Sequence, residues 1–145
     1  MDAMTYLRDH VALFKGVSGE NLASLAQTSE LISFGAGQTI LFKGATVDGL
    51  HVVVSGKVGI VIKAPNKPAA TVAELGPSDV FGEMSIVEMG TAAATVKSLE
   101  DGTAALVIPQ EAFRRVLQED EAFAVRVNEL IASRRAVAAP AAQRA

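Results

Sequence analysis

The chain has 145 residues, of which 50% are hydrophobic and 20% are charged. This size predicts about one domain with its own core, and the small charged fraction excludes a disordered chain. Thirteen Lys and Arg residues against sixteen Asp and Glu residues give a formal net charge of -3, which disfavours a nucleic-acid binder. The absence of cysteine excludes disulfides and thiolate zinc sites, and with only two histidines we expect no metal site.

The sequence shows no sign of export or membrane insertion. Charged residues interrupt the apolar ones throughout residues 1–14, so this segment does not have the pattern of a signal peptide. No stretch approaches the roughly 18 consecutive apolar residues that a spanning helix needs. We therefore expect a cytoplasmic protein without membrane insertion.

The first part of the chain predicts helices followed by many short strands. Apolar residues three or four apart indicate two helices within residues 4–28, the second with Ser18 as its N-cap. Short β-rich runs separated by Gly, Asn, Asp and Pro follow, as is typical of a small sandwich or barrel. Ser55-Gly56 has the composition of a two-residue hairpin turn. Strands are predicted at residues 30–34, 39–42, 50–54, 57–63, 70–75, 93–99 and 103–108.

After Pro109 the spacing of apolar residues becomes helical again. It predicts helices within residues 110–135, and the Ala- and Pro-rich residues 136–145 predict a disordered tail. Arg126, Glu129 and Arg134 are assigned positions outside the apolar face of the last helix. That face gathers four side chains, Phe123, Val127, Leu130 and Ile131.

This apolar face has two interpretations: it packs on the core of the domain, or it binds a protein partner or a second copy of the chain. We take it as an interaction surface, because the end of a chain is often the part most free to move or dock. Truncation after Gln118 is then expected to leave a folded β domain and to remove self-association or partner binding.

One loop combines residues suited to binding an anion. Within residues 76–88, a strand is expected to end in a turn and one or two helical turns to follow. N–H groups at a helix start lack internal partners and attract anions. Gly82 permits close backbone approach, and Glu83 can accept a hydrogen bond from a ligand hydroxyl. Taken alone, Phe81-Gly82-Glu83 is equally a glycine turn with an acidic residue at a helix start.

Glycines at 37, 44 and 56 and the segment Ala93-Ala94-Thr95-Val96 bracket this loop. With this loop, those glycines and that segment, the sequence resembles the cyclic nucleotide-binding domain family over residues 13–133. The resemblance implies a mainly β fold, a jelly-roll-like β-roll of about eight strands at residues 30–108 with flanking helices, all within a single domain at residues 1–135. It also implies a phosphate-binding cassette from Phe81 to about Val96.

By this resemblance, Glu83 accepts the ribose 2′-hydroxyl of a cyclic nucleotide, cAMP or cGMP. Gly82 and Met84 offer backbone amides near the phosphate, and Ser85 matches a small cassette position. The family's Pro-Arg-Ala-Ala-Thr motif reads Thr91-Ala92-Ala93-Ala94-Thr95 here, which puts Ala92 at the place of the phosphate-binding arginine. The candidate ligand-binding residues are Gly82, Glu83, Met84, Ser85, Ala92 and Ala93.

The missing arginine weakens the expected site. A loss of about 3 kcal/mol of net binding lowers affinity by somewhat over a hundredfold. Lys97 does not replace the arginine in a regular strand, because it faces the opposite way from Ala92 and Val96. The sequence also offers no catalytic set and no DNA-reading element.

We therefore expect a non-enzymatic regulatory or adaptor module with no cofactor, which binds cyclic nucleotide weakly or not at all. The alternative is a functional cyclic nucleotide sensor that signals through its C-terminal helix.

Overall fold

This computed structural model describes the backbone of residues 2–88, 91–92 and 94–144, and the side chains of the same residues as far as 134. Side-chain caps define where the first helices begin. Asp2 accepts a hydrogen bond of 2.8 Å from the Thr5 N–H, and Ser18 accepts one of 3.1 Å from the Asn21 N–H. The Ser18 cap confirms the sequence prediction. The N-terminal elements are α1 (Ala3–His10), the 3-10 helix η1 (Ala12–Phe14) and α2 (Gly19–Thr28).

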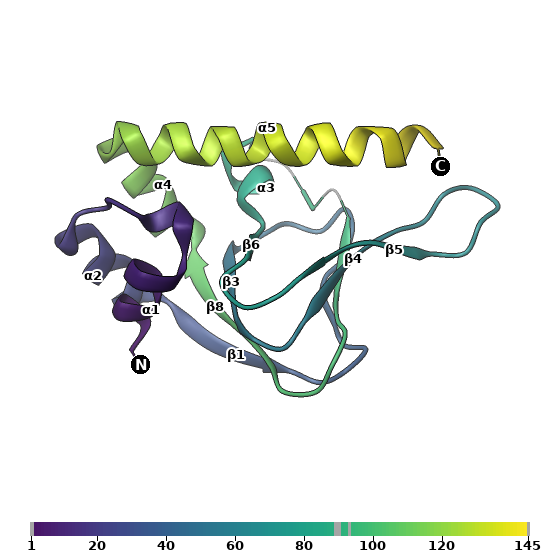
Figure 1. Ribbon diagram of the computed structural model, residues 1–145, viewed down its shortest axis with the longest axis horizontal. Coiled ribbons are helices and arrows are strands. Elements are labelled where there is room, and N and C mark those ends of the chain that lie inside the picture. Colours follow the sequence, from purple (N-terminus) through teal and green to yellow (C-terminus); the bar gives the residue numbers. More distant parts are fainter. Residues whose placement is uncertain (1, 89–90, 93, 145) are drawn as a thin grey trace.

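Eight strands form two four-stranded antiparallel sheets, which confirms the predicted β-roll (Figure 1). The first sheet has the order β1-β8-β3-β6 and the second has the order β2-β7-β4-β5. Among the strands of the described residues, the two-residue strand β6 is the one that the sequence pattern did not predict. The strands are β1 (Glu30–Phe34), β2 (Thr39–Leu41), β3 (Gly49–Ser55), β4 (Val58–Ile62), β5 (Ala70–Leu75), β6 (Val80–Phe81), β7 (Thr95–Ser98) and β8 (Thr103–Pro109).

The Ser55-Gly56 dipeptide is not a hairpin turn, contrary to the sequence prediction. It joins β3 and β4, but β3 pairs with β6 and β8 while β4 pairs with β5 and β7. Gly56 has a φ of 78°, and a Cβ there would lie 2.3 Å from Thr103 Oγ1. Only glycine fits, because the chain crosses from one sheet to the other directly against Thr103.

Three helices complete the domain: α3 (Glu83–Val87), α4 (Gln110–Glu119) and α5 (Glu121–Arg144). In Figure 1, α5 runs across the top of the molecule, above α4 and α3. The backbone is helical to Arg144, where the composition of residues 136–145 predicted a disordered tail. Alanine has the highest intrinsic helix propensity, so the same Ala-rich composition can extend a helix that has already begun.

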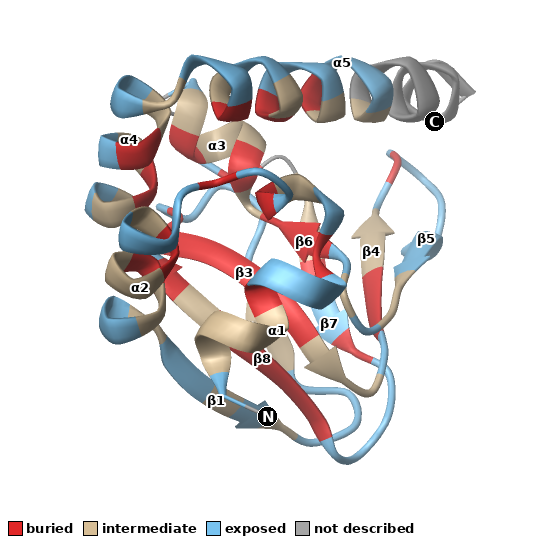
Figure 2. Cartoon of the chain, turned by 60° about the vertical axis from the view of Figure 1, so that its left-hand side comes forward, coloured by how far each residue is buried: buried red, intermediate tan, exposed pale blue. Residues whose placement is uncertain are grey.

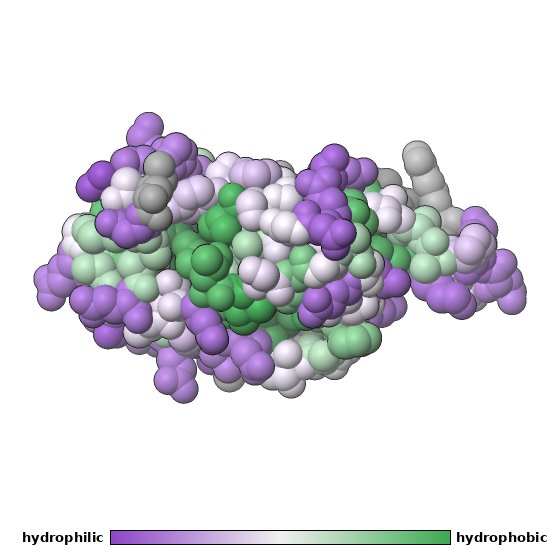
Figure 3. All heavy atoms as spheres, turned by 90° about the horizontal axis from the view of Figure 1, so that it is seen from below, coloured by the Kyte–Doolittle hydropathy of each residue, from purple (hydrophilic) through white to green (hydrophobic). Residues whose placement is uncertain are grey.

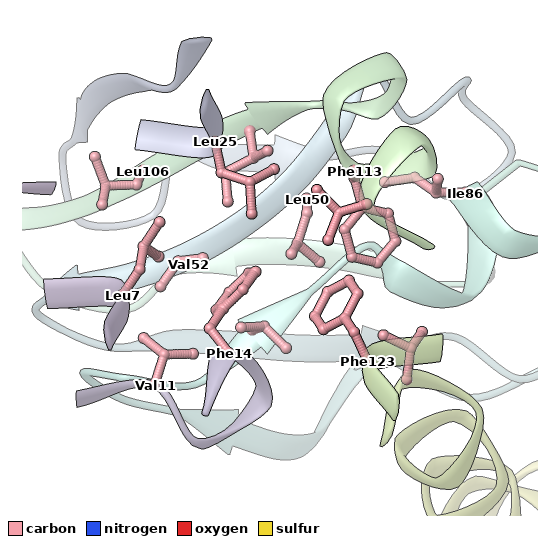
Figure 4. Close-up of a cluster of buried hydrophobic side chains, with 14 of the residues drawn as sticks. Leu7, Val11, Phe14, Leu25, Leu50, Val52, Ile86, Leu106, Phe113 and Phe123 are labelled. Carbon is pink, nitrogen blue, oxygen red and sulfur yellow. The ribbon is translucent and has the colours of Figure 1, made fainter. Parts of the chain in front are cut away.

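The main hydrophobic core lies where the N-terminal helices, the first sheet and the C-terminal helices meet (Figure 2). Three phenylalanines from η1, α4 and α5 occupy its centre (Figure 4). The Phe14 and Phe123 rings stack at 5.4 Å, and Phe113 meets Phe123 edge-on at 5.7 Å. Such pairs add to the stability gained from burying the rings.

The apolar face of α5 packs inward, so it is not an exposed interaction surface. Phe123 and Val127 are fully buried, Ile131 is nearly so, and Leu130 packs partly buried against the same core. The sequence pattern identified the side chains that share this face. It could not show whether the face contacts the core of the domain or a partner. A partner could reach these side chains only if α5 moved.

A second, smaller cluster fills the interior of the roll between the two sheets. Val53, Val58, Phe81 and Val96 form it. Phe81 and Val96 are the two ends of the predicted cassette, so this cluster anchors both ends of the loop.

The N-terminal helices leave part of the first sheet uncovered. A groove between α1, α2 and that sheet includes Tyr6, Leu31 and Leu106 in its lining, and Leu31 is 60% exposed. On the face seen from below, apolar atoms gather between hydrophilic margins (Figure 3). Within the described residues, no helix combines the length and hydropathy needed to cross a bilayer.

Candidate functional site

The cassette begins where β6 turns into α3. Gly82 forms this turn with a φ of 97° and is the N-cap of α3. A Cβ at Gly82 would lie 3.1 Å from the Gly49 carbonyl oxygen and 3.2 Å from Val47 Cγ1. The left-handed conformation and the close contacts both favour glycine. Gly82 therefore lets the turn lie directly on the start of β3.

His51 packs beneath this turn. Its ring stacks on Phe81 at 4.6 Å, and its Nδ1 lies 3.1 Å from the Gly49 carbonyl oxygen. A carbonyl oxygen only accepts, so Nδ1 carries the proton. Burial lowers the pKa of His51 to about 4, although the Gly49 hydrogen bond and Asp48 act in the opposite direction. His51 is therefore neutral at pH 7 and acts as a packing residue of the cassette.

We expect the stability of the domain to fall as the pH decreases from 6.5 towards 4. The unfolded chain protonates His51 near its ordinary pKa of about 6.5, whereas the folded chain resists protonation down to about 4. The free energy of unfolding should thus lose about 2 kcal/mol between pH 7 and pH 5 through this group. Urea denaturation across this range measures the slope.

The chain's other histidine supplies the control for this prediction. His10 is exposed on α1, so His10→Gln should keep the full slope, while His51→Gln should remove most of it. An unchanged slope in His51→Gln would show that other groups cause the pH dependence.

Glu83 is a buried carboxylate with a partner from the far end of the chain. Only 1% of the residue is exposed. Its Oε1 accepts a hydrogen bond from Arg134 Nη1 at 2.5 Å, and Arg134 Nη2 donates to the Val80 carbonyl. No donor among the described residues reaches Glu83 Oε2, which is also buried. The cassette thus holds one carboxylate oxygen paired with α5 and one that no donor of the described residues reaches.

Ala92, at the place of the expected arginine, is part of the core. It is 6% exposed and belongs to the main hydrophobic cluster. Its N–H donates to the Ala45 carbonyl and its carbonyl accepts from the Gly44 N–H, both at 2.9 Å. The segment before β3 thus holds the backbone of Ala92 through both its N–H and its carbonyl. Ala93 lies outside the described residues.

The remaining cassette residues also make internal contacts. The Ser85 hydroxyl donates to the Thr91 carbonyl at 3.0 Å, which joins α3 to the far side of the loop. Met84 packs partly buried against the main core. Among the described residues, no group of three His, Asp or Glu side chains could hold a metal ion.

Lys97, considered above as a replacement for the arginine, lies on the exposed face of its strand. Lys97 is exposed and Val96 is buried, in keeping with the alternation of a strand. Arg114 donates to the Ile86 carbonyl at 3.0 Å, at the C-terminal end of α3, and Arg126 donates to the Leu13 carbonyl at 3.1 Å. None of these contacts involves Glu83.

Arg134 was not among the predicted site residues, because its position was assigned outside the apolar face of the last helix. Arg134 follows Val127 by seven residues, and that spacing returns a helix to nearly the same face. The face that buries Val127 and Ile131 therefore points Arg134 at the cassette. This spacing is the signal that could have identified the residue.

The family of the chain follows from its match over this region. Residues 31–120 fit the family model described as cyclic nucleotide-binding domain. The chain belongs to the cyclic nucleotide-binding domain family. That Gly82 and Glu83 match the family's cassette glycine and glutamate, and Ala92 its arginine position, stays a prediction from the sequence.

Relatives of this cyclic nucleotide-binding domain include regulatory proteins. A CRP-like cAMP-activated global transcriptional regulator of Mycobacterium tuberculosis is 36% identical over 85 residues, which are 57% of this chain. The match covers 38% of that regulator, so the chain corresponds to one part of a longer relative.

Solved structures share the fold. The regulatory domain of Toxoplasma gondii PKA, crystallised with cAMP, has a TM-score of 0.77 and 18% identity, covering 92% of this chain and 48% of that one. The regulatory subunit of a cAMP-independent protein kinase A from Trypanosoma brucei has a TM-score of 0.73 and 17% identity, covering 92% and 44%. At these identities the similarity establishes the fold alone.

Proposed function

We propose that this domain is a non-enzymatic regulatory or adaptor module that binds cyclic nucleotide weakly or not at all. The buried position of Ala92 carries the proposal. Alanine supplies no charge, and the Ala92 side chain packs in the core. The site therefore lacks the planar, charged donor that binds a phosphate with two parallel hydrogen bonds.

The remaining charges do not compensate for this loss. Glu83 carries a negative charge, which repels a cyclic phosphate placed near it. Arg134 neutralises Glu83, but its two contacts go to Glu83 and Val80. Losing about 3 kcal/mol of phosphate binding would turn a site with a dissociation constant of about 1 μM into one of somewhat over about 100 μM.

One observation favours the alternative, a functional sensor of cAMP, cGMP or a related anion. Glu83 Oε2 is buried and has no hydrogen-bond donor among the described residues, and a buried polar atom is normally satisfied. A ligand hydroxyl could satisfy it. The fold does not decide between the two functions, because it occurs both in a domain crystallised with cAMP and in the regulatory subunit of a protein kinase A described as cAMP-independent.

Calorimetric titration separates the two functions. We expect cAMP, cGMP and a cyclic dinucleotide each to show a dissociation constant above about 10 μM. A lower value for any of them would establish the sensor instead. In that case Glu83→Gln should abolish the tight binding, which would locate it in the cassette.

We also propose how the domain passes on its signal. We place the module in the cytoplasm and assign its output to a protein partner or a second copy of the chain, reached through α5, rather than to DNA or a membrane. The outer side of α5 supports this assignment, because Val125 is 50% exposed there.

A further inference from the structure

The first sheet ends in a regular, exposed edge strand. β1 is the outer strand of the order β1-β8-β3-β6, and it pairs with β8 in an unbroken register from Glu30 to Phe34. Its burial alternates little, with most of its residues exposed, and Figure 2 shows it at the outer margin of the sheet. The backbone N–H and C=O groups on the open side of such a strand can pair with a further strand.

The other edges of the two described sheets each carry a feature that discourages such pairing. β5 has a bulge at Val72, and the register of β2 shifts between Thr39 and Leu41. β6 has only two residues, and Arg134 donates a hydrogen bond to its Val80 carbonyl. Bulges, short length and covering groups are the usual means by which proteins prevent edge pairing. β1 is therefore the edge that is left open.

The apolar groove between α1, α2 and the first sheet lies beside this edge. Leu31 is the cross-strand partner of Leu106, and such partners lie on the same face of a sheet. Leu106 is 7% exposed and Leu31 is 60% exposed, and both line the groove together with Tyr6 and Val54. An apolar side chain from a strand added beside β1 would continue this row and cover Leu31.

The charges at the two ends of β1 are acidic. Glu30 begins the strand, and beyond its other end the Asp101 carboxylate accepts a hydrogen bond of 2.9 Å from the Ala36 N–H. Asp2 is the charged residue among the described residues that line the groove. If two β1 strands paired along their full length, Glu30 of one copy would lie opposite Phe34 of the other, near that copy's Asp101. Because like charges destabilise such a pair, the edge suits a basic partner better than a second copy.

We propose that β1 and the groove beside it bind an extended segment of a protein partner, which joins the first sheet as a further strand. Main-chain hydrogen bonds supply affinity in this mode of recognition, and alternate side chains supply specificity. The segment has apolar residues at every second position to cover Leu31, and it has Lys or Arg at both ends to meet Glu30 and Asp101. In Figure 1, β1 lies at the bottom of the molecule and α5 at the top, so this surface is separate from the one proposed on α5.

A peptide titration followed by amide hydrogen exchange tests this surface. The probe is a synthetic peptide in which valine and threonine alternate between two terminal lysines. It should bind with a dissociation constant below about 1 mM and, at saturation, slow exchange in residues 30–34 by about tenfold. Two control peptides should each bind at least about tenfold more weakly. One has glutamates in place of the lysines, and the other has its internal amides N-methylated so that they cannot donate.

Substitutions on two sheet edges locate the binding. Leu31→Lys places a charge on β1 and removes the apolar contact, so it should weaken binding of the lysine peptide by about tenfold or more. Val72→Lys makes a matched change on β5, where the residue is 44% exposed, and it should leave binding unchanged. Glu30→Gln should weaken binding a few-fold and reduce its dependence on salt. Circular dichroism checks that each variant is folded.

Several outcomes would overturn the proposal. They are absence of binding, equal binding of either control peptide, and slowed exchange that spares residues 30–34. Equal loss of affinity in Leu31→Lys and Val72→Lys would show that the peptide does not distinguish the two edges. Self-association of the unaltered protein that Leu31→Lys abolishes would identify a second copy as the occupant, and would equally refute a basic partner.

Discussion

Truncation after Gln118 is expected to unfold the domain, in contrast to the folded β-roll that the sequence pattern predicted. The truncation removes α5 and with it Phe123, Val127 and Ile131, all of which are buried in the main core. Losing a buried phenylalanine alone costs about 3–5 kcal/mol, and a domain of this kind has about 5–15 kcal/mol of net stability. Circular dichroism during urea titration measures the loss.

A second truncation, which removes fewer residues, gives the matched control. A chain that ends at Arg134 keeps the buried face of α5 and the ion pair with Glu83, so it should unfold cooperatively and near the full-length midpoint. A cooperative transition with unchanged free energy in the shorter chain would show that α5 is not part of the core.

An arginine at position 92 is expected to raise affinity for cAMP by about two orders of magnitude. The change is Ala92→Arg, introduced together with Arg134→Gln. In the single variant Arg134 would still occupy Glu83, whereas in the double variant the new guanidinium can pair with both the carboxylate and the phosphate. Calorimetric titration against Arg134→Gln alone measures the gain.

The stability lost through the larger side chain must be distinguished from the affinity gained through the added charge. Ala92 is buried, and a larger side chain there should destabilise the domain by about 1–3 kcal/mol. Ala92→Gln in the same background is larger than alanine but carries no charge, so it should lose similar stability without the gain in affinity. A folded arginine variant that binds no better than this control would show that further phosphate contacts are missing.

Local signals predicted most of the fold. Ser18 is identified as a cap by its residue type and by the apolar spacing that follows it, and the structure forms that cap. The alternation of buried Val96 with exposed Lys97 was predicted in the same way. These features depend on neighbouring residues, and for that reason they can be read from one sequence.

The features that the sequence pattern missed depend on contacts between distant segments. Ser55-Gly56 has the composition of a hairpin, but β3 and β4 each find partners elsewhere. Glu83 is recognisable as a cassette residue, yet its burial and its pairing with Arg134 depend on how α5 crosses the roll. The inward direction of the α5 face likewise depends on Phe14, which lies more than a hundred residues before Phe123.

The sheet topology also constrains how the protein is made. Glu30 of β1 pairs with Val107 of β8, and Thr39 of β2 pairs with Lys97 of β7. A nascent chain that has reached only β6 can form the local β4–β5 pair, but β1 and β2 still lack their partners. Pairings of such long range form slowly and leave unpaired strands prone to aggregation. Chaperone binding during synthesis should therefore concentrate in the interval between the emergence of β1 and that of β8 from the ribosome.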